Sequence, residues 1–298
     1  LAGATLWRLE SAHQVLTTST LAQAGERAQQ LAAAKALQVE ALLTAADLGL
    51  RQLRDDAVSG SLPALGAHLD GLREALPRGA VGHVTMSDAQ GRLVFPSPVL
   101  QGAGEQPLGV ADRDYFRLAA ATPADRLQVG AMVQSRVTGQ PVLPLARPLL
   151  RQGRFDGVAV LTLSPAFLAD ALARQQPGPH DSITLFHADG GVVAGSSGSM
   201  PAVAPAAGAP APQRPWVQQP GALPQGQLRR TDAPDGRPRL HAWYRLDRLP
   251  LVVDVGLDEA TVLAPVEVEQ QRAHQRVAVL VPLSMLLVLA VSWLLLRV

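Results

Sequence analysis

One pattern of short strands occurs twice in this chain, about 100 residues apart. In each copy, runs rich in Val, Leu and Ile are separated by turns that contain Gly, Asp and Pro, which is typical of antiparallel strands. The strands expected in the first copy cover residues 81–95, 127–133, 142–150 and 158–163. Those expected in the second copy cover residues 183–194, 226–230, 239–245 and 251–257. The sequence therefore predicts two small sheet modules in series.

The residues before the first strand predict helices. No proline occurs over residues 4–57, and apolar residues recur there at helical spacing, so we expect one long helix with a joint near Gly25. A second, short helix is expected over residues 62–76. A long leading helix followed by antiparallel sheets, with helices on one side of each sheet, predicts an α+β fold.

The segment from Val277 to Leu296 is twenty residues long and carries no charged residue. A helix of this length measures about 30 Å, which matches the hydrocarbon layer of a bilayer. We therefore expect a C-terminal transmembrane helix, and the alternative is a helix buried in a protein core. Residues 1–7 leave open whether a first transmembrane helix ends there.

These elements divide the chain into four parts. We expect a helical part over residues 1–77, a membrane-distal sheet module over 78–176, a membrane-proximal sheet module over 177–262, and an exit helix with the transmembrane segment over 263–298. Residues 196–215 of the proximal module are rich in Gly, Ala, Pro and Ser and cannot bury enough apolar surface to fold alone. We expect them to form a flexible surface loop.

The composition argues against catalysis and nucleic-acid binding. A formal net charge of +1 provides no basic field for nucleic acid. The absence of cysteine excludes disulfides, thiolate catalysis and cysteine-based zinc sites. The seven histidines lack metal-ligand spacing, and the sequence contains neither a phosphate-binding glycine loop nor a nucleophile elbow. We therefore expect no enzyme activity in this segment, no cofactor and no metal.

Five motifs follow the long leading helix: Ala111–Arg117 (ADRDYFR), Ser135–Pro141 (SRVTGQP), Leu145–Pro148 (LARP), Gly153–Val158 (GRFDGV) and Leu249–Leu257 (LPLVVDVGL). In their order and spacing they resemble the double Cache family of tandem PAS-like sensor domains, and the resemblance covers nearly the whole chain except the loop 196–215. It implies an extracytoplasmic sensor of a bacterial inner-membrane receptor, with both modules in the periplasm. Such a sensor binds a small molecule in the distal module and signals through its last helix to a cytoplasmic histidine kinase or diguanylate cyclase.

The resemblance also places part of the ligand pocket at an Arg and two aromatic residues. In this sequence these are Arg113, Tyr115 and Phe116, with Asp114 between them. An arginine can bind a carboxylate through paired hydrogen bonds, and an aromatic ring can close a pocket. The alternative is that Tyr115 and Phe116 are core residues and that the charges cap a short helix.

Arg136, Arg147 and Thr162 complete the set of candidate ligand-binding residues. If Arg136 and Arg147 face the same cavity as Arg113, that cavity is cationic and selects an anion, so a small carboxylate is the expected ligand. Each arginine could equally be a solvated strand residue. Amino-acid-sensing members of the family carry an Asp at the position that matches Thr162, and a neutral hydroxyl does not offset the cost of desolvating an ammonium group. Amino acids are therefore not the expected ligands.

A different class of function also fits the sequence, namely an ectodomain that binds no small molecule and instead recognises a protein partner or sets the geometry of a dimer. We expect a homodimer in either case. A pocket of about 300 Å³ or more, lined by Arg113, Tyr115 and Arg147, favours ligand sensing. A sheet face packed with Leu and Val favours the interaction module.

Overall fold

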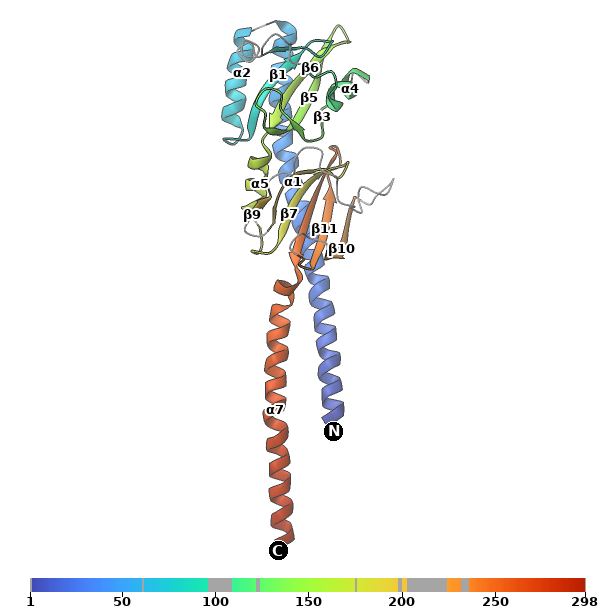
Figure 1. Cartoon of the computed structure of the whole chain (residues 1–298), viewed down its shortest axis with the longest axis vertical. Coiled ribbons are helices and arrows are strands. Elements are labelled where there is room, and N and C mark those ends of the chain that lie inside the picture. The colour runs from blue at the N-terminus through green and yellow to red at the C-terminus, as the bar shows by residue number, and fades with distance from the viewer. Residues whose placement is uncertain are drawn as a thin grey trace.

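The computed structural model describes residues 2–60, 62–95, 109–121, 124–174, 176–197, 200–202, 224–231 and 236–297. A long helix, α1 (Ala2–Ser59), runs along two antiparallel sheets that are stacked one beyond the other, and the chain closes with a second long helix, α7 (Glu259–Arg297). Both chain ends lie on the same side of the two sheets (Figure 1). The α+β class, the long N-terminal helix and the two antiparallel sheets are confirmed.

The sheet farther from the chain ends is called the distal sheet. Its strands are β1 (Val81–Ser87), β2 (Leu93–Phe95), β3 (Gln128–Val129), β4 (Val133–Gln134), β5 (Pro141–Arg151) and β6 (Arg154–Leu163). They are arranged in the order β2-β1-β6-β5-β3, with β4 also paired to β5, and every pair is antiparallel. Helices α1 and α2 (Leu62–Ala75) pack on one face of this sheet, and α4 (Asp114–Ala121) packs on the other.

The second sheet is called the proximal sheet, and α5 (Pro165–Ala173) connects the two. Its strands are β7 (Ser182–His187), β8 (Val192–Ser197), β9 (Met200–Ala202), β10 (Gln225–Arg230), β11 (Arg239–Arg245) and β12 (Leu251–Asp258). They are arranged in the order β10-β11-β12-β7-β8-β9, again with every pair antiparallel. Ser164 is the N-cap of α5, because its hydroxyl accepts a hydrogen bond from the backbone N–H of Phe167.

One hydrophobic core runs along α1 and joins the two sheets. Small residues spaced four apart on α1, from Ala24 to Ala36, are buried and let the helix lie close to the strands. Farther along the helix, Leu43 belongs to the same buried cluster as Leu161 of the distal sheet and Val253 of the proximal sheet. The two sheets therefore share this core through α1, and each sheet has in addition a smaller buried cluster of its own.

The expected joint near Gly25 is wrong, because α1 is continuous over Ala2–Ser59. A Cβ atom at Gly25 would meet the side-chain amide of Gln227, so the glycine leaves room for this side chain of β10 against the helix. The expected strand over 127–133 is also wrong, since two short strands, β3 and β4, replace it. Part of the expected loop 196–215 forms the end of β8 and β9, because main-chain pairing there needs no apolar side chains. The remainder of that loop lies outside the described residues.

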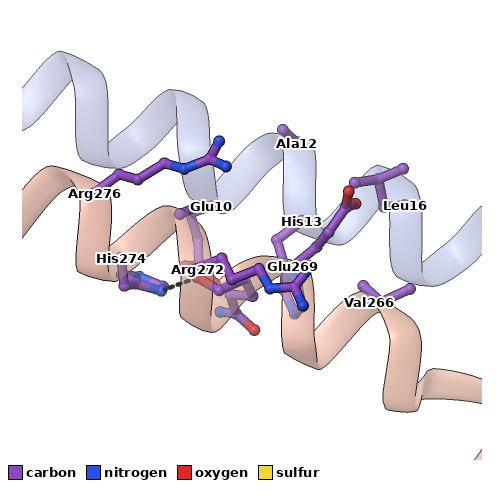
Figure 2. A pocket seen from close by; sticks show the side chains of 11 residues that line it. Glu10, Ala12, His13, Leu16, Val266, Glu269, Arg272, His274 and Arg276 are labelled. Carbon is purple, nitrogen blue, oxygen red and sulfur yellow. Dashed lines mark hydrogen bonds between the residues drawn. The ribbon is translucent and has the colours of Figure 1, made fainter.

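Helix α7 leaves β12 directly and runs beside the first turns of α1 (Figure 1). Figure 2 shows the groove between the two helices, which has a volume of about 260 Å³ and is lined by residues that include Glu10, His13, Glu269 and Arg272. We call this pair of helices the stem.

The C-terminal transmembrane helix expected over 277–296 is not shown by the structure. Among the described residues, no helix is both long enough and apolar enough to cross a membrane. The backbone of this segment belongs to α7, and eight of its side chains, at positions 281, 283–285, 287, 288, 291 and 294, lie outside the described part of the chain.

Candidate ligand-binding site

A small cavity lies on the face of the distal sheet that α4 covers. Its volume is about 30 Å³, which is room for one or two water molecules. The candidate residues that line it are Arg113, Tyr115, Arg136 and Thr162. The structure therefore brings these four together, in a cavity much smaller than the 300 Å³ or so expected of a site for a small organic ligand.

Two arginines stand at this cavity, and each has a partner. Arg113 lies just before α4 and donates from Nη2 to the backbone oxygen of Gln134, at 2.9 Å. Arg136 lies in the turn between β4 and β5, and not on a strand as expected; its Nη1 and Nη2 donate to the two carboxylate oxygens of Asp112, at 2.8 and 2.7 Å. The hydrogen bond from Arg136 lowers the pKa of Asp112, so this carboxylate is ionised at neutral pH.

Thr162 stabilises a bulge in β1 at the floor of the cavity. Two residues of β1, Gly82 and His83, lie opposite the single residue Thr162 of β6. The Thr162 hydroxyl lies 2.9 Å from the backbone N of His83, 3.0 Å from its backbone O and 3.0 Å from its Nδ1. Ser135 Oγ lies 3.3 Å from Nε2 of the same ring. Burial lowers the pKa of His83 below 6.5, so the ring is neutral at neutral pH, with one nitrogen as donor and the other as acceptor.

The remaining members of the 113–116 motif have different positions. Burial raises the pKa of Tyr115 to about 12, so its hydroxyl remains protonated and can donate a hydrogen bond within the cavity. Phe116 instead packs edge-on against Phe155, with ring centroids 5.5 Å apart. The carboxylate of Asp114 accepts hydrogen bonds from the backbone N–H groups of Tyr115 and Ala131, and so ties the start of α4 to a loop. Phe116 and Asp114 thus have the structural roles that the alternative hypothesis gave them.

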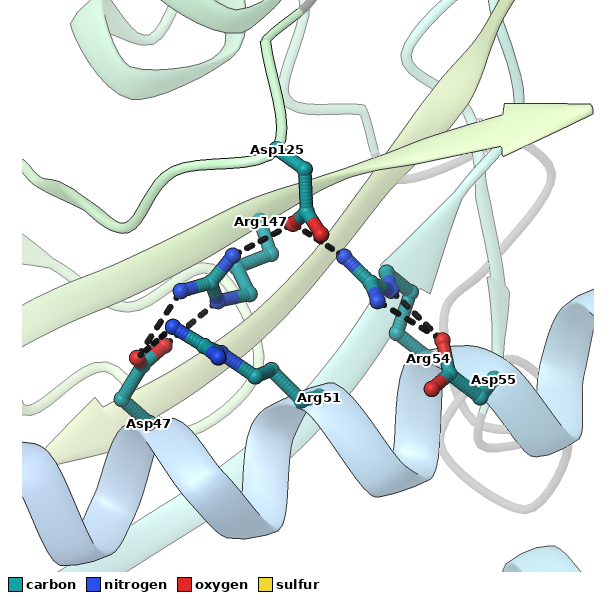
Figure 3. A network of polar contacts seen from close by, with 6 residues as sticks. All are labelled: Asp47, Arg51, Arg54, Asp55, Asp125 and Arg147. Carbon is teal, nitrogen blue, oxygen red and sulfur yellow. Dashed lines mark hydrogen bonds and ion pairs between the residues drawn. The ribbon is translucent and has the colours of Figure 1, made fainter. Parts of the chain in front are cut away.

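Arg147 is not in this cavity but on the opposite face of the distal sheet. Its side chain is 2 % exposed and donates to both carboxylate oxygens of Asp47 on α1, with 2.8 Å between Nη2 and Oδ2. It also contacts Asp125, which in turn binds Arg54 of α1 (Figure 3). Burial alone would lower the pKa of Arg147, but the bonds to Asp47 and Asp125 raise it, so the side chain is a fixed cation.

Strand alternation explains why Thr162 and Arg147 point in opposite directions. Side chains two apart on a strand share a face. On β6, Val158 and Val160 share the α4 face with Thr162, whereas on β5, Leu145 and Leu149 share the α1 face with Arg147. The expectation that Arg147 and Arg136 face one cavity is therefore wrong.

His83 and Ser135 are among the lining residues that were not expected from the sequence. The sequence does carry a signal for the first, because His83, Thr85 and Ser87 are polar residues two apart in β1, and His83 and Thr85 line the cavity. Ser135 is adjacent to Arg136, and its hydroxyl accepts hydrogen bonds from the backbone N–H groups of Val137 and Thr138, which shape the turn.

No protein-family model and no curated protein matches the chain. Several solved structures, however, do match the chain. The extracellular domain of rpHK1S-Z16, a protein assigned as a histidine kinase, matches with a TM-score of 0.64 and 27 % identity, over 82 % of this chain and 98 % of that one. The ligand-binding domain of the Pseudomonas fluorescens chemoreceptor CtaA, in complex with L-isoleucine, matches with a TM-score of 0.59 and 15 % identity, over 80 % of this chain and 94 % of that one. The ligand-binding domain of the Campylobacter jejuni chemoreceptor Tlp3, in complex with 4-methylisoleucine, matches with a TM-score of 0.53 and 15 % identity, over 83 % of this chain and 94 % of that one.

Each of the three matches spans about four-fifths of this chain. A shared fold alone does not assign a ligand. The chain therefore has the double Cache fold, which it shares with the extracellular sensor domains of histidine kinases and chemoreceptors.

Proposed function

We propose that this chain is the extracytoplasmic sensing part of a transmembrane receptor and that it binds a small carboxylate in the distal cavity. The observation that carries the proposal is the pair of guanidinium groups, Arg113 and Arg136, that line this cavity. None of the described lining residues is acidic, and His83, Tyr115 and Thr162 contribute neutral groups. This arrangement suits an anion better than a zwitterion, because a buried ammonium group needs a partner of opposite charge.

Binding requires the cavity to widen, since it now holds only about 30 Å³. The turn that carries Arg136 is the element expected to move. Its ion pair with Asp112 is solvent-exposed, with the two side chains 37 % and 63 % accessible, and such pairs contribute only about 0 to 1 kcal/mol. A ligand carboxylate can therefore replace Asp112 as the partner of Arg136 at little cost.

The test compares propionate with L-alanine, which differ by one ammonium group, through the melting temperature of the protein. We expect propionate to raise it and L-alanine to raise it less. Arg113→Ala should weaken propionate binding about tenfold, because a charged hydrogen bond contributes about 1.5 to 3 kcal/mol. Arg117→Ala is the matched control, since Arg117 is an exposed residue of α4 that does not line the cavity. The proposal is contradicted if L-alanine raises the melting temperature more than propionate does. It is also contradicted if Arg113→Ala and Arg117→Ala weaken propionate binding equally.

We further propose that the chain is held at the bacterial inner membrane by residues 277–296, with both sheets in the periplasm. The support is the sequence of this segment, which has no charged residue, together with the extracellular location stated for the histidine kinase domain described above. The chain should then sediment with membranes after alkaline extraction, and a variant truncated after Arg276 should be released. Release of the full chain contradicts membrane attachment.

Helix α7 is the proposed route of the signal to a cytoplasmic histidine kinase or diguanylate cyclase. It continues β12 without a break and packs beside α1 in the stem (Figure 2). A continuous helix transmits a small shift if the ligand binds two states unequally. Two glycines inserted after Gln271 should uncouple propionate from the output of the intact receptor without loss of binding, whereas Gln271→Ala should not. An unchanged response in the insertion variant contradicts transmission through α7.

The exposed face of α1 supports a homodimer. Leu37 and Leu48 are 64 % and 60 % exposed, and residues eleven apart lie on nearly the same face of a helix. An apolar stripe of this kind is suited to packing against the same stripe of a second copy. We expect Leu37→Glu to shift the protein from dimer to monomer in light scattering, and Gln38→Glu, on a neighbouring exposed position, to leave it unchanged. A monomeric parent protein contradicts this proposal.

One observation favours the second candidate function, an interaction or dimerisation ectodomain that recognises a protein partner. The distal cavity is lined by Arg113 and Tyr115 but not by Arg147, and its volume is about 30 Å³. If no small carboxylate changes the melting temperature while the dimer persists, this second function is the better one.

A further inference from the structure

A larger cavity lies between the two sheets, on the side of the distal sheet away from Arg113. Its volume is about 330 Å³, within the range of sites that hold small molecules. Its walls come from α1, from the loop before β3, from β5, and from the turn between β11 and β12. Because these elements belong to both sheets and to the helix that joins them, we call it the inter-sheet cavity.

Several charges at this cavity already neutralise one another. Arg147 is bound by Asp47 and Asp125, and Arg51 lies 3.2 Å from Asp47 (Figure 3). Two arginines and two aspartates therefore form a balanced set. They fix one wall of the cavity and leave no charge free for a ligand.

Three further charged residues line the same cavity and are not paired in this way. Arg126 and Arg248 are exposed, and neither has an ion pair with any residue that the structure describes. Glu40 is half-buried, and it too has no ion pair with any residue that the structure describes. Two cations and one anion leave an excess of one positive charge, so a monoanion makes the site neutral.

The cavity also has an apolar part. Leu43 is buried, and Leu127 and Leu249 are half-buried beside it. Arg126 and Leu127 are adjacent in the chain, as are Arg248 and Leu249, so a charged and an apolar group come from the loop before β3 and from the β11–β12 turn alike. A ligand with one anionic group and a short hydrocarbon body matches both features.

We infer that the inter-sheet cavity is a second ligand site, which takes a small monocarboxylate with an apolar body. Arg126 and Arg248 supply the positive charge, and Leu43, Leu127 and Leu249 receive the hydrocarbon part. A molecule bound there contacts the distal loop, the proximal turn and α1 together, so it stabilises one arrangement of the two sheets. This site is separate from the proposed distal site, because no residue lines both cavities.

The test is titration calorimetry of the full chain in mild detergent, with 4-methylpentanoate and L-leucine as probes. The two have the same branched body and differ by the ammonium group of leucine. We expect 4-methylpentanoate to bind at least about fivefold more tightly, because leucine carries no net charge. Equal or tighter binding of leucine, or no binding of either probe, overturns the inference.

Variants then locate the site. Arg126→Ala and Arg248→Ala should each weaken 4-methylpentanoate binding about fivefold or more, whereas Arg73→Ala, an exposed arginine on α2, should have no effect. Glu40→Gln should strengthen binding about twofold, since it removes a repelling charge, and a gain of affinity cannot come from unfolding. Arg113→Ala should leave this affinity unchanged. Loss of binding in Arg113→Ala with none in Arg248→Ala assigns the probe to the distal cavity and overturns the inference.

Discussion

Arg147 and Asp47 are 100 residues apart in the sequence, and their side chains form a paired hydrogen bond that joins the distal sheet to α1. The Arg147 side chain is 2 % exposed and that of Asp47 is 12 % exposed, so neither charge is left to water. The pair fixes the orientation of the distal sheet on the helix that both sheets share.

Removal of one partner of this pair should destabilise the protein strongly. We expect Asp47→Ala to lower the free energy of unfolding by about 3 to 5 kcal/mol, because Arg147 would keep a buried charge without its main partner. Arg51→Ala removes a half-exposed arginine that contacts the same carboxylate and should cost less than about 1 kcal/mol. Urea unfolding followed by circular dichroism measures both. Similar losses of unfolding free energy in the two variants would show that the burial of Arg147 does not determine the cost of removing an ion-pair partner.

Thr162 should be important for stability through its hydroxyl and not through its size. Thr162→Val keeps the branched shape but removes the partner of the His83 backbone, so we expect a loss of about 1 to 3 kcal/mol. Thr162→Ser keeps the hydroxyl and should lose less. Thermal unfolding separates the two variants, and a valine variant as stable as the parent would rule out a role of the hydroxyl in the bulge.

His83 should make stability depend on pH in a defined direction. Burial holds its pKa in the folded protein below the ordinary value of 6.5, so the unfolded chain binds the proton more readily. The free energy of unfolding should therefore be unaffected by His83 above pH 6.5 and should fall with decreasing pH from 6.5 down to the folded pKa. The loss amounts to about 1.4 kcal/mol for each unit by which the pKa is lowered.

The ring signals of His83 in a nuclear magnetic resonance titration give the folded pKa directly. Unfolding of His83→Gln over the same pH range provides the comparison, because the glutamine has no titrating ring and its unfolding should vary less with pH. A His83 pKa at or above 6.5 in the folded protein would contradict the effect of burial.

The start of α7 should depend on Asp258. Its Oδ2 accepts hydrogen bonds from the backbone N–H of Thr261, at 3.0 Å, and from the Thr261 hydroxyl, at 2.7 Å, as an N-cap does. We expect Asp258→Ala to lower the free energy of unfolding by about 0.5 to 2 kcal/mol and to speed hydrogen exchange in the first turn of α7. Asp258→Asn keeps the acceptor and should lie close to the parent. Equal exchange in all three proteins would mean that the cap does not hold this turn.

The sequence predicted the elements better than it predicted the faces of the strands. The repeated strand pattern and the proline-free leading segment lead directly to the two sheets and to α1. The direction of Arg147 could not be predicted, because β5 is buried on both faces from Val142 to Leu149 and so lacks the alternation that marks an inward side. For the same reason the sequence could not show that Asp47 of α1 is its partner.

The candidate site shows the same limit. Of the motif around Arg113, Arg113 and Tyr115 line the cavity, whereas Phe116 packs against Phe155 and the Asp114 carboxylate accepts hydrogen bonds from backbone N–H groups, so that the binding role of the motif stays a prediction. The contribution of His83 depends on a bulge that places two residues of β1 opposite one of β6. A bulge is a property of paired strands, and a single strand read alone does not reveal it.

Helix α1 has mechanical consequences because of its length. At 58 residues it extends for about 87 Å at 1.5 Å per residue. A rotation of about one degree at the distal end of such a rigid lever displaces its opposite end by about 1.5 Å, the rise of a single residue. A ligand at either cavity therefore needs to rotate α1 only slightly to displace the opposite end of this helix by a distance comparable to one residue.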